Sequence, residues 1–461
     1  MPSALPDISA VELRRLIASR QVSPVELMDA CISRIENLNP AINAICATDF
    51  TRAREAAREA EAQVMRGGPL GPLHGLPLGV KDLQDTAGLL TTYGNVGLRG
   101  NVPAKDNALV AKLRAAGAIV TAKTNVPDMG AGANTRNPVW GATGNPFNPT
   151  LNAGGSSGGS AAALAAGMLP ICTGSDTGGS LRIPASLCGV VGLRPSPGLV
   201  ANDARPLGWS VISVLGPMGR NVADTALLMS ASVGPDARDP LSYPVDASAF
   251  WPLRPVDLST LRIGTTEDFG VCIVDPEIRR VFRQRVEAVR PLVASCEPVD
   301  LQLDDADRAW AHLEQTRISR RFAKAFEQYD LILAPVTPVT PFPWTELFAG
   351  HIDGQAMRNY YHWLGLTYVV TLATNPALAL PCGKDEHGMP FGLQVIGRLH
   401  GDAQLLAASQ ALEQVFADNE SLRRPVPDLK ALQTARPDLK SIVTHPPELA
   451  GVQGTGGMTA V

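Results

Sequence analysis

Cysteine is scarce in this sequence, with seven residues in a chain of 461. The seven are scattered, odd in number and never arranged as Cys-x-x-Cys, so they predict neither a disulfide framework nor a zinc ribbon. We interpret them as small apolar core residues in a reducing compartment. They are Cys31, Cys46, Cys172, Cys188, Cys272, Cys296 and Cys382.

Long hydrophobic runs are absent. A membrane span needs about 18 consecutive apolar residues, whereas the longest candidate, 161–172, is broken by Gly167 and Pro170. Charged residues interrupt the start of the chain, which therefore lacks the apolar core of a signal peptide. We expect a soluble cytoplasmic protein with no membrane partner.

Excess charge of one sign is also absent. The 40 Lys+Arg residues nearly balance the 44 Asp+Glu residues, giving a net charge of -4. This balance argues against broad electrostatic binding to nucleic acid or to an anionic membrane. The 45% of hydrophobic residues suits a globular protein with a large core.

Lysine is rare, and its eight positions exclude one class of serine enzyme. None has Ser three residues before it, so the S-x-x-K pattern of penicillin-binding enzymes is ruled out. The phosphate-binding patterns GxxxxGK[ST] and GxGxxG in its βαβ context are absent as well. A G-x-S-x-G pattern occurs at 154–158, but the histidines that a hydrolase elbow would need lie in unremarkable contexts.

Glycine, by contrast, is concentrated in one part of the chain. Residues 154–198 contain eleven glycines in 45 positions, in two serine-containing loops that lie 24 residues apart. Turns alone could require some of these glycines, but two such loops with doubled glycines are hard to explain in that way. We expect the residues that carry out the protein's chemistry to lie in these two loops.

The remaining pattern alternates helices and strands, which predicts an α/β fold with a mostly parallel or mixed sheet. Residues 1–65 are expected to be mostly helical, and Ser23 with Glu26 forms a capping-box pattern. Residues 421–461, rich in Pro, Gly and Thr, are expected to form a flexible tail. Further helices are expected at 109–116, 277–294 and 404–416, and strands at 76–80, 118–124, 261–266, 330–336 and 392–397.

Three separated segments together resemble the amidase signature family. They are Gly75–Asp82, Gly154–Gly159 and Asp176–Ala185, and they agree with the family in order and spacing. The likeness continues through Cys188–Pro195 to about residue 420. It implies a single large domain over 1–420, in which helices flank a central mixed sheet.

The resemblance implies a Ser-Ser-Lys triad, with Ser180 as nucleophile, Ser156 as bridging serine and Lys81 as base. It also implies a cis peptide bond before Ser156. A serine hydroxyl becomes a strong nucleophile only when a base accepts its proton, and lysine can do so only as a neutral amine. The uncharged run 76–80 fits a buried lysine with a lowered pKa. Asp82 would oppose this, but adjacent strand residues point to opposite faces.

Gly178 and Gly179 have no side chains, so we expect their loop to leave room for an oxyanion hole. The four candidate donors are the N–H groups of Thr177, Gly178, Gly179 and Ser180. Around them we interpret four further residues as supporting or substrate-binding. Asp176 and Arg182 would support the loop first and contact substrate second, Ser157 would join the triad's hydrogen bonds, and Met129 would line the acyl side of the pocket.

The resemblance implies a hydrolase that cleaves a carboxylic amide through an acyl-serine, with esters or carbamates as side substrates. It implies no metal and no cofactor, with a small-molecule amide as partner, and is compatible with a homodimer. The alternative is an amidotransferase A-type subunit that supplies ammonia to a partner chain. A non-catalytic scaffold is a third hypothesis. The segment 295–330 is shorter than in many family members, which predicts a more open pocket or one completed by loops such as 342–361.

Overall fold

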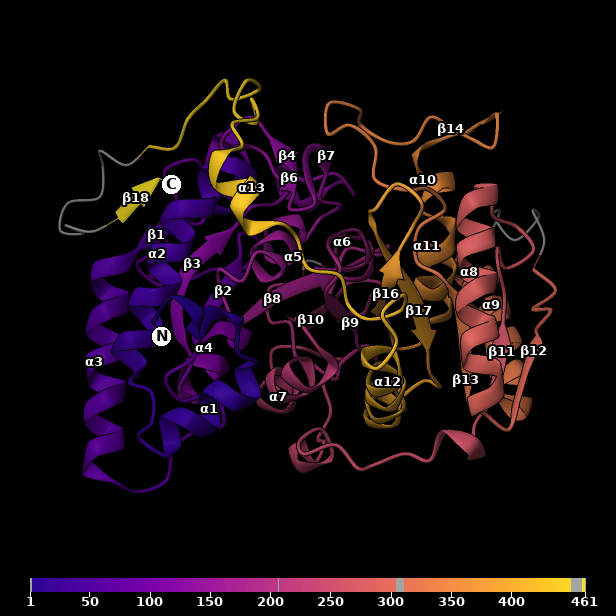
Figure 1. The fold of residues 1–461 in the computed structure, drawn as a ribbon, viewed down its shortest axis with the longest axis horizontal. Helices are drawn as coiled ribbons and strands as arrows, with labels where there is room; N and C mark the ends of the chain where they lie inside the picture. The colour runs from indigo at the N-terminus through magenta and orange to yellow at the C-terminus, as the bar shows by residue number, and fades with distance from the viewer. Residues whose placement is uncertain (1, 206, 304–310, 449–457, 461) are drawn as a thin grey trace.

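One continuous mixed sheet forms the centre of the molecule (Figure 1). The computed structural model describes residues 2–205, 207–303, 311–448 and 458–460. Within them the sheet has twelve strands in the order β12-β11-β13-β17-β16-β9-β10-β8-β2-β3-β1-β18. This confirms the predicted fold class. The strands are β1 Ile45–Asp49, β2 Pro77–Lys81, β3 Ile119–Thr124, β8 Ile171–Asp176, β9 Val191–Arg194, β10 Val214–Gly219, β11 Arg262–Thr265, β12 Ser295–Pro298, β13 Leu331–Pro335, β16 Ala377–Lys384, β17 Pro390–Ile396 and β18 Met458–Ala460.

Strand direction changes along the sheet. The strand β2 is parallel to both neighbours, β3 and β8, and β11 is parallel to β12 and β13. Antiparallel pairs from β8 through β10, β9, β16 and β17 to β13 join these two parallel groups. Three two-stranded ribbons lie outside the sheet: β4 Arg136–Asn137 with β5 Gly141–Ala142, β6 Gly144–Asn145 with β7 Asn148–Asn152, and β14 His351–Ile352 with β15 Gln355–Ala356.

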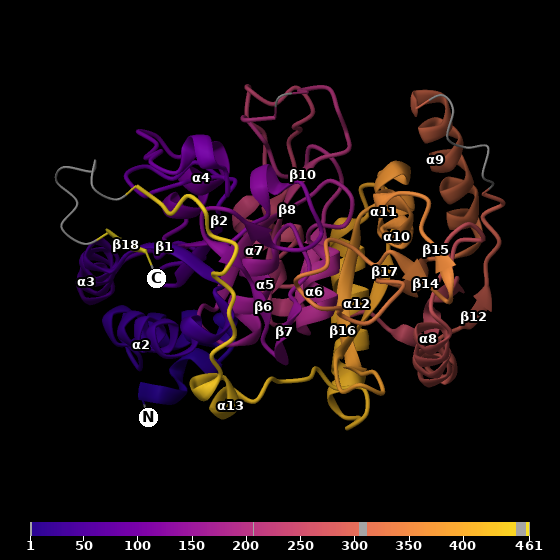
Figure 2. The same cartoon turned by 90° about the horizontal axis from the view of Figure 1, so that it is seen from above.

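Helices cover the sheet along its whole length (Figures 1 and 2). The N-terminal helices α2 and α3 lie at the β1 end, and α8 and α9 lie at the β12 end. Every residue of α5 and α6 is buried, so these two short helices form part of the central core. The helices are α1 Ala10–Ala18, α2 Pro24–Ile42, α3 Phe50–Arg66, α4 Ala108–Ala115, α5 Gly158–Ala165, α6 Arg182–Cys188, α7 Val222–Ser232, α8 Pro276–Val289, α9 Ala311–Gln328, α10 Tyr360–Trp363, α11 Gly365–Ala373, α12 Asp402–Ala417 and α13 Leu429–Thr434.

Local sequence signals account for several element boundaries. Ser23 caps α2 and Glu26 completes the predicted capping box. The helix predicted over 277–294 ends earlier, because α8 stops at Val289 and gives way to a 3-10 turn. Pro291 explains the early end, since proline has no N–H to donate within a helix.

The region expected to be a flexible tail is packed over much of its length. Helix α13 lies against α2, and Leu432 and Leu439 are buried. The carbonyl of Leu439 accepts a 2.8 Å hydrogen bond from the N–H of Ala142. The expectation fails for residues 421–448 because scattered apolar side chains find sites on the main body. Residues 449–457 and 461 lie outside the described residues.

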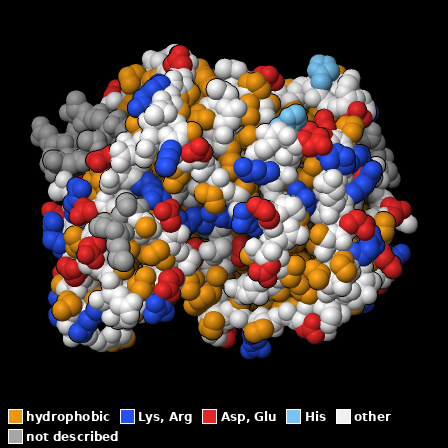
Figure 3. All heavy atoms as spheres, viewed as in Figure 1, with side chains coloured by type: hydrophobic (Ala, Val, Ile, Leu, Met, Phe, Trp, Pro, Cys, Tyr) orange, Lys and Arg blue, Asp and Glu red, His pale blue; other side chains and the backbone are white. Residues whose placement is uncertain are grey.

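The surface carries both signs of charge. Figure 3 shows Lys and Arg side chains spread among Asp and Glu side chains on one face, as the near-balance of the composition suggests. No helix in the described ranges is long and apolar enough to span a membrane.

Candidate active site

A buried lysine at the carboxyl end of β2 is the centre of the site. Leu78 and Gly79 of β2 pair with Ile171 and Cys172 of the parallel β8, so Lys81 lies beside the last residues of β8. The carboxyl ends of parallel strands are where ligands bind in open α/β sheets. The side chain of Lys81 has no solvent exposure.

Three serine hydroxyls surround the Lys81 ammonium nitrogen. Its Nζ lies 2.8 Å from Ser156 Oγ, 2.8 Å from Ser157 Oγ and 2.9 Å from Ser175 Oγ. Burial lowers the pKa of Lys81 to about 7, against the opposing influence of the Asp176 carboxylate. A substantial fraction of this lysine is therefore neutral near pH 7, as a general base requires.

Ser175 is the contact that the sequence analysis missed. It is two residues after Thr173 on β8, and the Thr173 hydroxyl accepts a 3.0 Å hydrogen bond from the N–H of Lys81. Residues two apart in a strand share a face. That alternation puts Ser175 on the same face of β8 as Thr173, and the pairing of β8 with β2 brings this face beside Lys81.

Asp82 points away from the lysine, as strand alternation predicts. Its carboxylate accepts hydrogen bonds from the N–H and the hydroxyl of Thr92, at 3.1 and 2.6 Å. Burial raises the pKa of Asp82 to about 6, and the nearby Lys123 opposes that rise. Asp82 makes no direct ion pair with Lys81 within the described chain.

The first glycine loop, residues 154–159, places Ser156 next to Lys81. The Gly155–Ser156 peptide bond is cis, as the resemblance implies. Gly154 has a φ of 72°, and a Cβ placed on it would lie 2.8 Å from the Cα of Pro184. Glycine is therefore required at 154 by both conformation and space.

The second glycine loop, residues 177–180, holds Ser180 beside the first glycine loop. The N–H of Ser157 donates a 3.2 Å hydrogen bond to the carbonyl of Ser180, which ties the two loops together. Gly179 has a φ of 128°, and a Cβ there would lie 2.3 Å from Thr367 Oγ1. The loop thus packs directly against α11.

One of the four expected oxyanion donors is already occupied. The N–H of Gly179 donates to Asp176 Oδ1 at 2.9 Å, so it supports the loop instead of facing a substrate. In this conformation the amide supports the loop, and its role as an oxyanion donor stays a prediction. In the described chain the N–H groups of Gly178 and Ser180 have no protein acceptor. The role of Thr177 stays a prediction.

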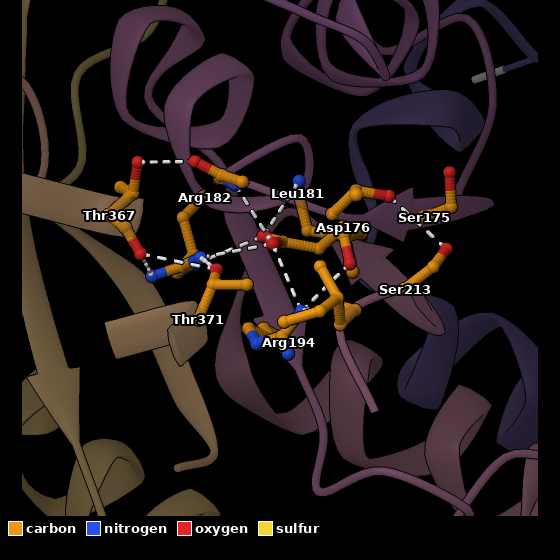
Figure 4. A network of polar contacts seen from close by, with 12 residues as sticks. Ser175, Asp176, Leu181, Arg182, Arg194, Ser213, Thr367 and Thr371 are labelled. Carbon is orange, nitrogen blue, oxygen red and sulfur yellow. Dashed lines mark hydrogen bonds and ion pairs between the residues drawn. The ribbon is translucent and has the colours of Figure 1, made fainter. Parts of the chain in front are cut away.

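Asp176 and Arg182 form a buried support beneath this loop (Figure 4). The Asp176 carboxylate receives Arg182 Nε and Nη2 at 3.0 Å and Arg194 Nη1 at 3.3 Å. These two guanidinium groups hold the pKa of Asp176 well below its usual range, against the effect of burial. Both residues are fully buried. Their placement fits the predicted supporting role and leaves neither exposed for substrate.

Arg182 also connects the loop to the other half of the sheet. Its Nη1 donates to the Thr367 carbonyl at 2.9 Å and to Gln394 Oε1 at 2.7 Å. Figure 4 shows its guanidinium between the Asp176 carboxylate and the threonines of α11. The geometry of the second glycine loop therefore depends on α11 and β17, which lie about 200 residues later in the sequence.

Met129 lies in a 3-10 turn, Asp128–Gly130, and is 55% exposed. The turn is followed closely by Gly132 and Ala133, whose backbone packs against Gly155. Met129 is thus on a segment that reaches the first glycine loop. Its contact with substrate remains a prediction.

A cavity of about 580 Å³ is lined in part by residues of α11. Its walls come from 271–273, from α9 through Ile318 and from 355–372. A second cavity of about 650 Å³ is lined largely by residues 339–351. Loops between 342 and 361 line parts of both cavities. Their part in completing the substrate pocket stays a prediction.

Comparison with known proteins places the chain in a family. The family model for Amidase matches residues 26–313 and 301–406, which together span most of the sequence. The chain belongs to the amidase family. This confirms the resemblance to amidase signature enzymes and makes the chain an amidase, a hydrolase of amide C–N bonds.

Named relatives of this amidase cover nearly its full length. The acylamidase of Rhodococcus erythropolis is 32% identical over 88% of this chain and 95% of that protein. The A-type subunit of glutamyl-tRNA(Gln) amidotransferase from Chloroflexus aurantiacus is also 32% identical, over 87% of this chain and 94% of that protein.

Solved structures agree with this placement. A bacterial aryl acylamidase of the amidase signature family superposes with a TM-score of 0.82 at 28% identity, covering 93% of this amidase and 99% of that chain. The A-type subunit of the glutamyl-tRNA(Gln) amidotransferase from Thermotoga maritima superposes with a TM-score of 0.75 at 25% identity, covering 92% and 98%. Across the residues that the structure describes, no group of three or more His, Cys, Asp or Glu side chains could hold a metal ion.

Proposed function

We propose that this amidase cleaves a carboxylic amide through an acyl-Ser180 intermediate, with Lys81 as base and Ser156 as the bridging serine. The observation that carries the proposal is the 2.8 Å contact between Lys81 Nζ and Ser156 Oγ in a fully buried setting. A lysine with a pKa of about 7 can accept a proton near neutral pH. The hydrogen bond from Ser157 to Ser180 supports the placement of the nucleophile beside that pair.

In the first step the Ser180 hydroxyl attacks the amide carbonyl carbon. Its proton passes to Ser156, while the Ser156 proton passes to the neutral Lys81 amine. The amides of Gly178 and Ser180 stabilise the oxyanion that forms; one such donor is worth about 2.7–4 kcal/mol. When the C–N bond breaks, the proton returns from Lys81 through Ser156 to the leaving amine.

In the second step water attacks the acyl-Ser180 ester. The proton of that water travels through Ser156 to Lys81 and then returns to Ser180 as the ester bond breaks. The carboxylic acid leaves and the enzyme regains its starting state. Esters and carbamates share this acyl-transfer chemistry and are expected side substrates, while the chemistry uses no cofactor.

Labelling with a fluorophosphonate tests the nucleophile. The wild-type protein is expected to be labelled on one serine, and Ser180→Ala is expected to lose the label together with amide hydrolysis. Ser230→Ala is a matched control, because Ser230 lies on α7 and its hydroxyl only donates to the Leu227 carbonyl. Full labelling of Ser180→Ala would overturn the assignment.

The similarity to amidotransferase subunits of the A type favours a second candidate, release of ammonia from glutamine for a partner chain. This function would use the same residues on a different amide. It predicts weak hydrolysis by the isolated chain and a stable complex with another protein. Size-exclusion chromatography with parallel assays on glutamine and on simple amides separates the two candidates and also reports whether the chain forms a homodimer.

A further inference from the structure

The strands β2 and β8 separate at the end of the sheet where Lys81 lies. In the described chain their backbone pairing stops at Gly79 and Cys172. On its other side β2 stays paired with β3 through Lys81, and β8 stays paired with β10 through Asp176. Side chains must therefore fix how far the last residues of β2 and β8 lie from each other.

The Thr173 hydroxyl makes one contact across this separation. It accepts a 3.0 Å hydrogen bond from the N–H of Lys81, while the Thr173 carbonyl accepts a 2.9 Å hydrogen bond from Ser160 Oγ. The same hydroxyl donates to Gln84 Oε1 at 2.6 Å. Because a hydroxyl has a single proton, this bond to Gln84 leaves the oxygen lone pairs of Thr173 free to accept the Lys81 N–H.

The Gln84 side chain makes a second contact with β8. Its Nε2 donates to the carbonyl of Gly174 at 3.4 Å. Gln84 is 1% exposed and lies in a turn closed by a 3.0 Å hydrogen bond from its N–H to the Lys81 carbonyl. Its own carbonyl accepts a hydrogen bond from the buried Lys123 Nζ. One fixed amide therefore holds two successive residues of β8 against the end of β2 that carries Lys81.

We propose that Gln84 is a positioning residue for Lys81, because its hydrogen bonds to Thr173 and Gly174 hold the end of β8 and so keep the next residue, Ser175, on the lysine amine. The inference rests on the proposed function and adds a residue to it. Gln84 is buried and its side-chain hydrogen bonds go to β8, so it acts through Ser175 and not on the substrate.

The chemistry of a neutral amine explains why this position matters. Such an amine has two N–H bonds and one lone pair. With Ser157 Oγ at 2.8 Å and Ser175 Oγ at 2.9 Å accepting the two N–H bonds, the lone pair is directed to the Ser156 hydroxyl at 2.8 Å. In the proposed mechanism the proton of Ser156 moves to that lone pair. A displaced Ser175 would let the amine rotate away from Ser156.

The first experiment compares Gln84→Met with the wild type on p-nitroacetanilide and p-nitrophenyl acetate. Methionine has a similar volume but cannot replace the amide's hydrogen bonds, and the substitution leaves the charges of Asp82, Lys123 and Asp176 in place. The kcat is expected to fall about fivefold, as for loss of one hydrogen bond. KM should stay within about threefold of the wild type, because a buried residue that does not contact substrate acts on the chemical step.

The pH dependence gives a readout that a merely structural role would not change. Water that enters beside a displaced Ser175 solvates the Lys81 ammonium ion and so raises the pKa of Lys81. The lower inflection of kcat/KM is therefore expected to move to higher pH by about half a unit or more in Gln84→Met. Asn375→Leu is the matched control: this buried amide donates to the Gly397 carbonyl at 2.7 Å, and three strands lie between β16, which follows it, and β2. Its inflection should stay that of the wild type.

A double-variant cycle tests the route through Ser175. If Gln84 acts by holding Ser175, adding Gln84→Met to Ser175→Ala should lower kcat by less than about twofold beyond Ser175→Ala alone. Thr173→Val should reproduce the loss seen in Gln84→Met, whereas Thr173→Ser, which keeps the hydroxyl, should retain kcat within about twofold. Losses that multiply in full in the double variant would overturn the proposal.

A crystal structure of Gln84→Met decides the geometry without any assay. The distance from Lys81 Nζ to Ser175 Oγ is expected to exceed about 3.5 Å, beyond hydrogen-bond range. If Gln84→Met does not fold, Gln84→Asn takes its place, since its shorter side chain cannot reach both β8 residues. An unchanged distance would overturn the inference and leave the amidase assignment intact. Full activity of Lys81→Ala would count against the proposed function, and the distance would still decide the role of Gln84.

Discussion

Two buried lysines on neighbouring strands illustrate what makes a lysine a base. Lys81 ends β2 and Lys123 lies in the adjacent β3, where it pairs with Val80. Both side chains are fully buried, and burial lowers the pKa of Lys81 to about 7 and that of Lys123 to about 8. Burial and a lowered pKa are therefore common to both.

Their hydrogen-bond partners differ. Lys81 contacts three serine hydroxyls, which can either donate or accept a hydrogen bond. Lys123 donates to the carbonyl of Gln84 and to Thr86 Oγ1 at 3.0 Å, and the Asp82 carboxylate favours its charged form. A carbonyl can only accept a hydrogen bond, and the Asp82 carboxylate favours the ammonium form of Lys123. The comparison teaches that the partners of a buried lysine, more than its burial, decide between catalysis and structural support.

Lys81→Ala should produce the largest effect. Loss of the proposed general base is expected to lower kcat for amide hydrolysis by about 10²–10⁴-fold, since that is the usual contribution of general base catalysis. Circular dichroism should show an unchanged fold, because a small cavity replaces a charge that was costly to bury. Turnover within threefold of the wild type would remove the distinction between the two lysines.

Lys123→Met should instead act on stability. It removes the cation that favours the buried Asp82 carboxylate and leaves the Gln84 carbonyl without its lysine donor, and an unpaired buried polar group typically costs about 1–3 kcal/mol of unfolding free energy. Urea unfolding at pH 7.5 measures this, and kcat of the folded fraction should stay within a few fold of the wild type. The double variant Asp82→Asn/Lys123→Met should recover part of the loss. A loss of activity comparable to that of Lys81→Ala, with unchanged stability, would contradict the comparison.

The pH dependence of activity should follow the titration of Lys81 and not that of Lys123. The base must be neutral, so kcat/KM is expected to fall about tenfold per pH unit below about 7 and to level off above it. The residual activity of Lys81→Ala should show no such inflection, whereas Lys123→Met should retain it. A flat profile between about pH 5.5 and 7 would exclude Lys81 as the titrating base.

Ser175→Ala should have the smallest effect. It removes one of three hydroxyl contacts to Lys81, worth about 1 kcal/mol, which corresponds to about a fivefold loss of kcat. Because Ser175 acts by positioning Lys81, the inflection in the pH profile should move as well. Ser230→Ala serves again as the matched control, and an unchanged profile in Ser175→Ala would assign Ser175 a purely structural role.

Much of the fold could be predicted from local signals. The strands at β2, β3, β11, β13 and β17 and the helices α3, α4 and α12 occur where period and composition predicted them. The predictions failed where a proline or a long-range contact, and not the hydrophobic period, determined the structure. Pro291 ended α8 early, and long-range contacts packed residues 421–448 onto the body.

The site, too, could be predicted only where the sequence itself carries the signal. The resemblance to the amidase signature family implied that Lys81 acts together with Ser156 and that Ser157 joins their hydrogen bonds, and Lys81 contacts both serines. The engagement of the Gly179 amide by Asp176 was missed, because a hydrogen bond depends on the direction of the N–H group and not on residue type. Ser175 was missed because its role depends on which strand lies beside β2.

By itself, the sequence determined the residue types that the chemistry requires and the positions where only glycine fits, together with the local starts and ends of most elements. These depend on backbone conformation and side-chain chemistry within a few residues. The tertiary structure alone decided which buried lysine has serine partners and how Arg182 joins the second glycine loop to α11 and β17. Those features require side chains up to about 200 residues apart to meet, and no local pattern specifies where such pairs meet.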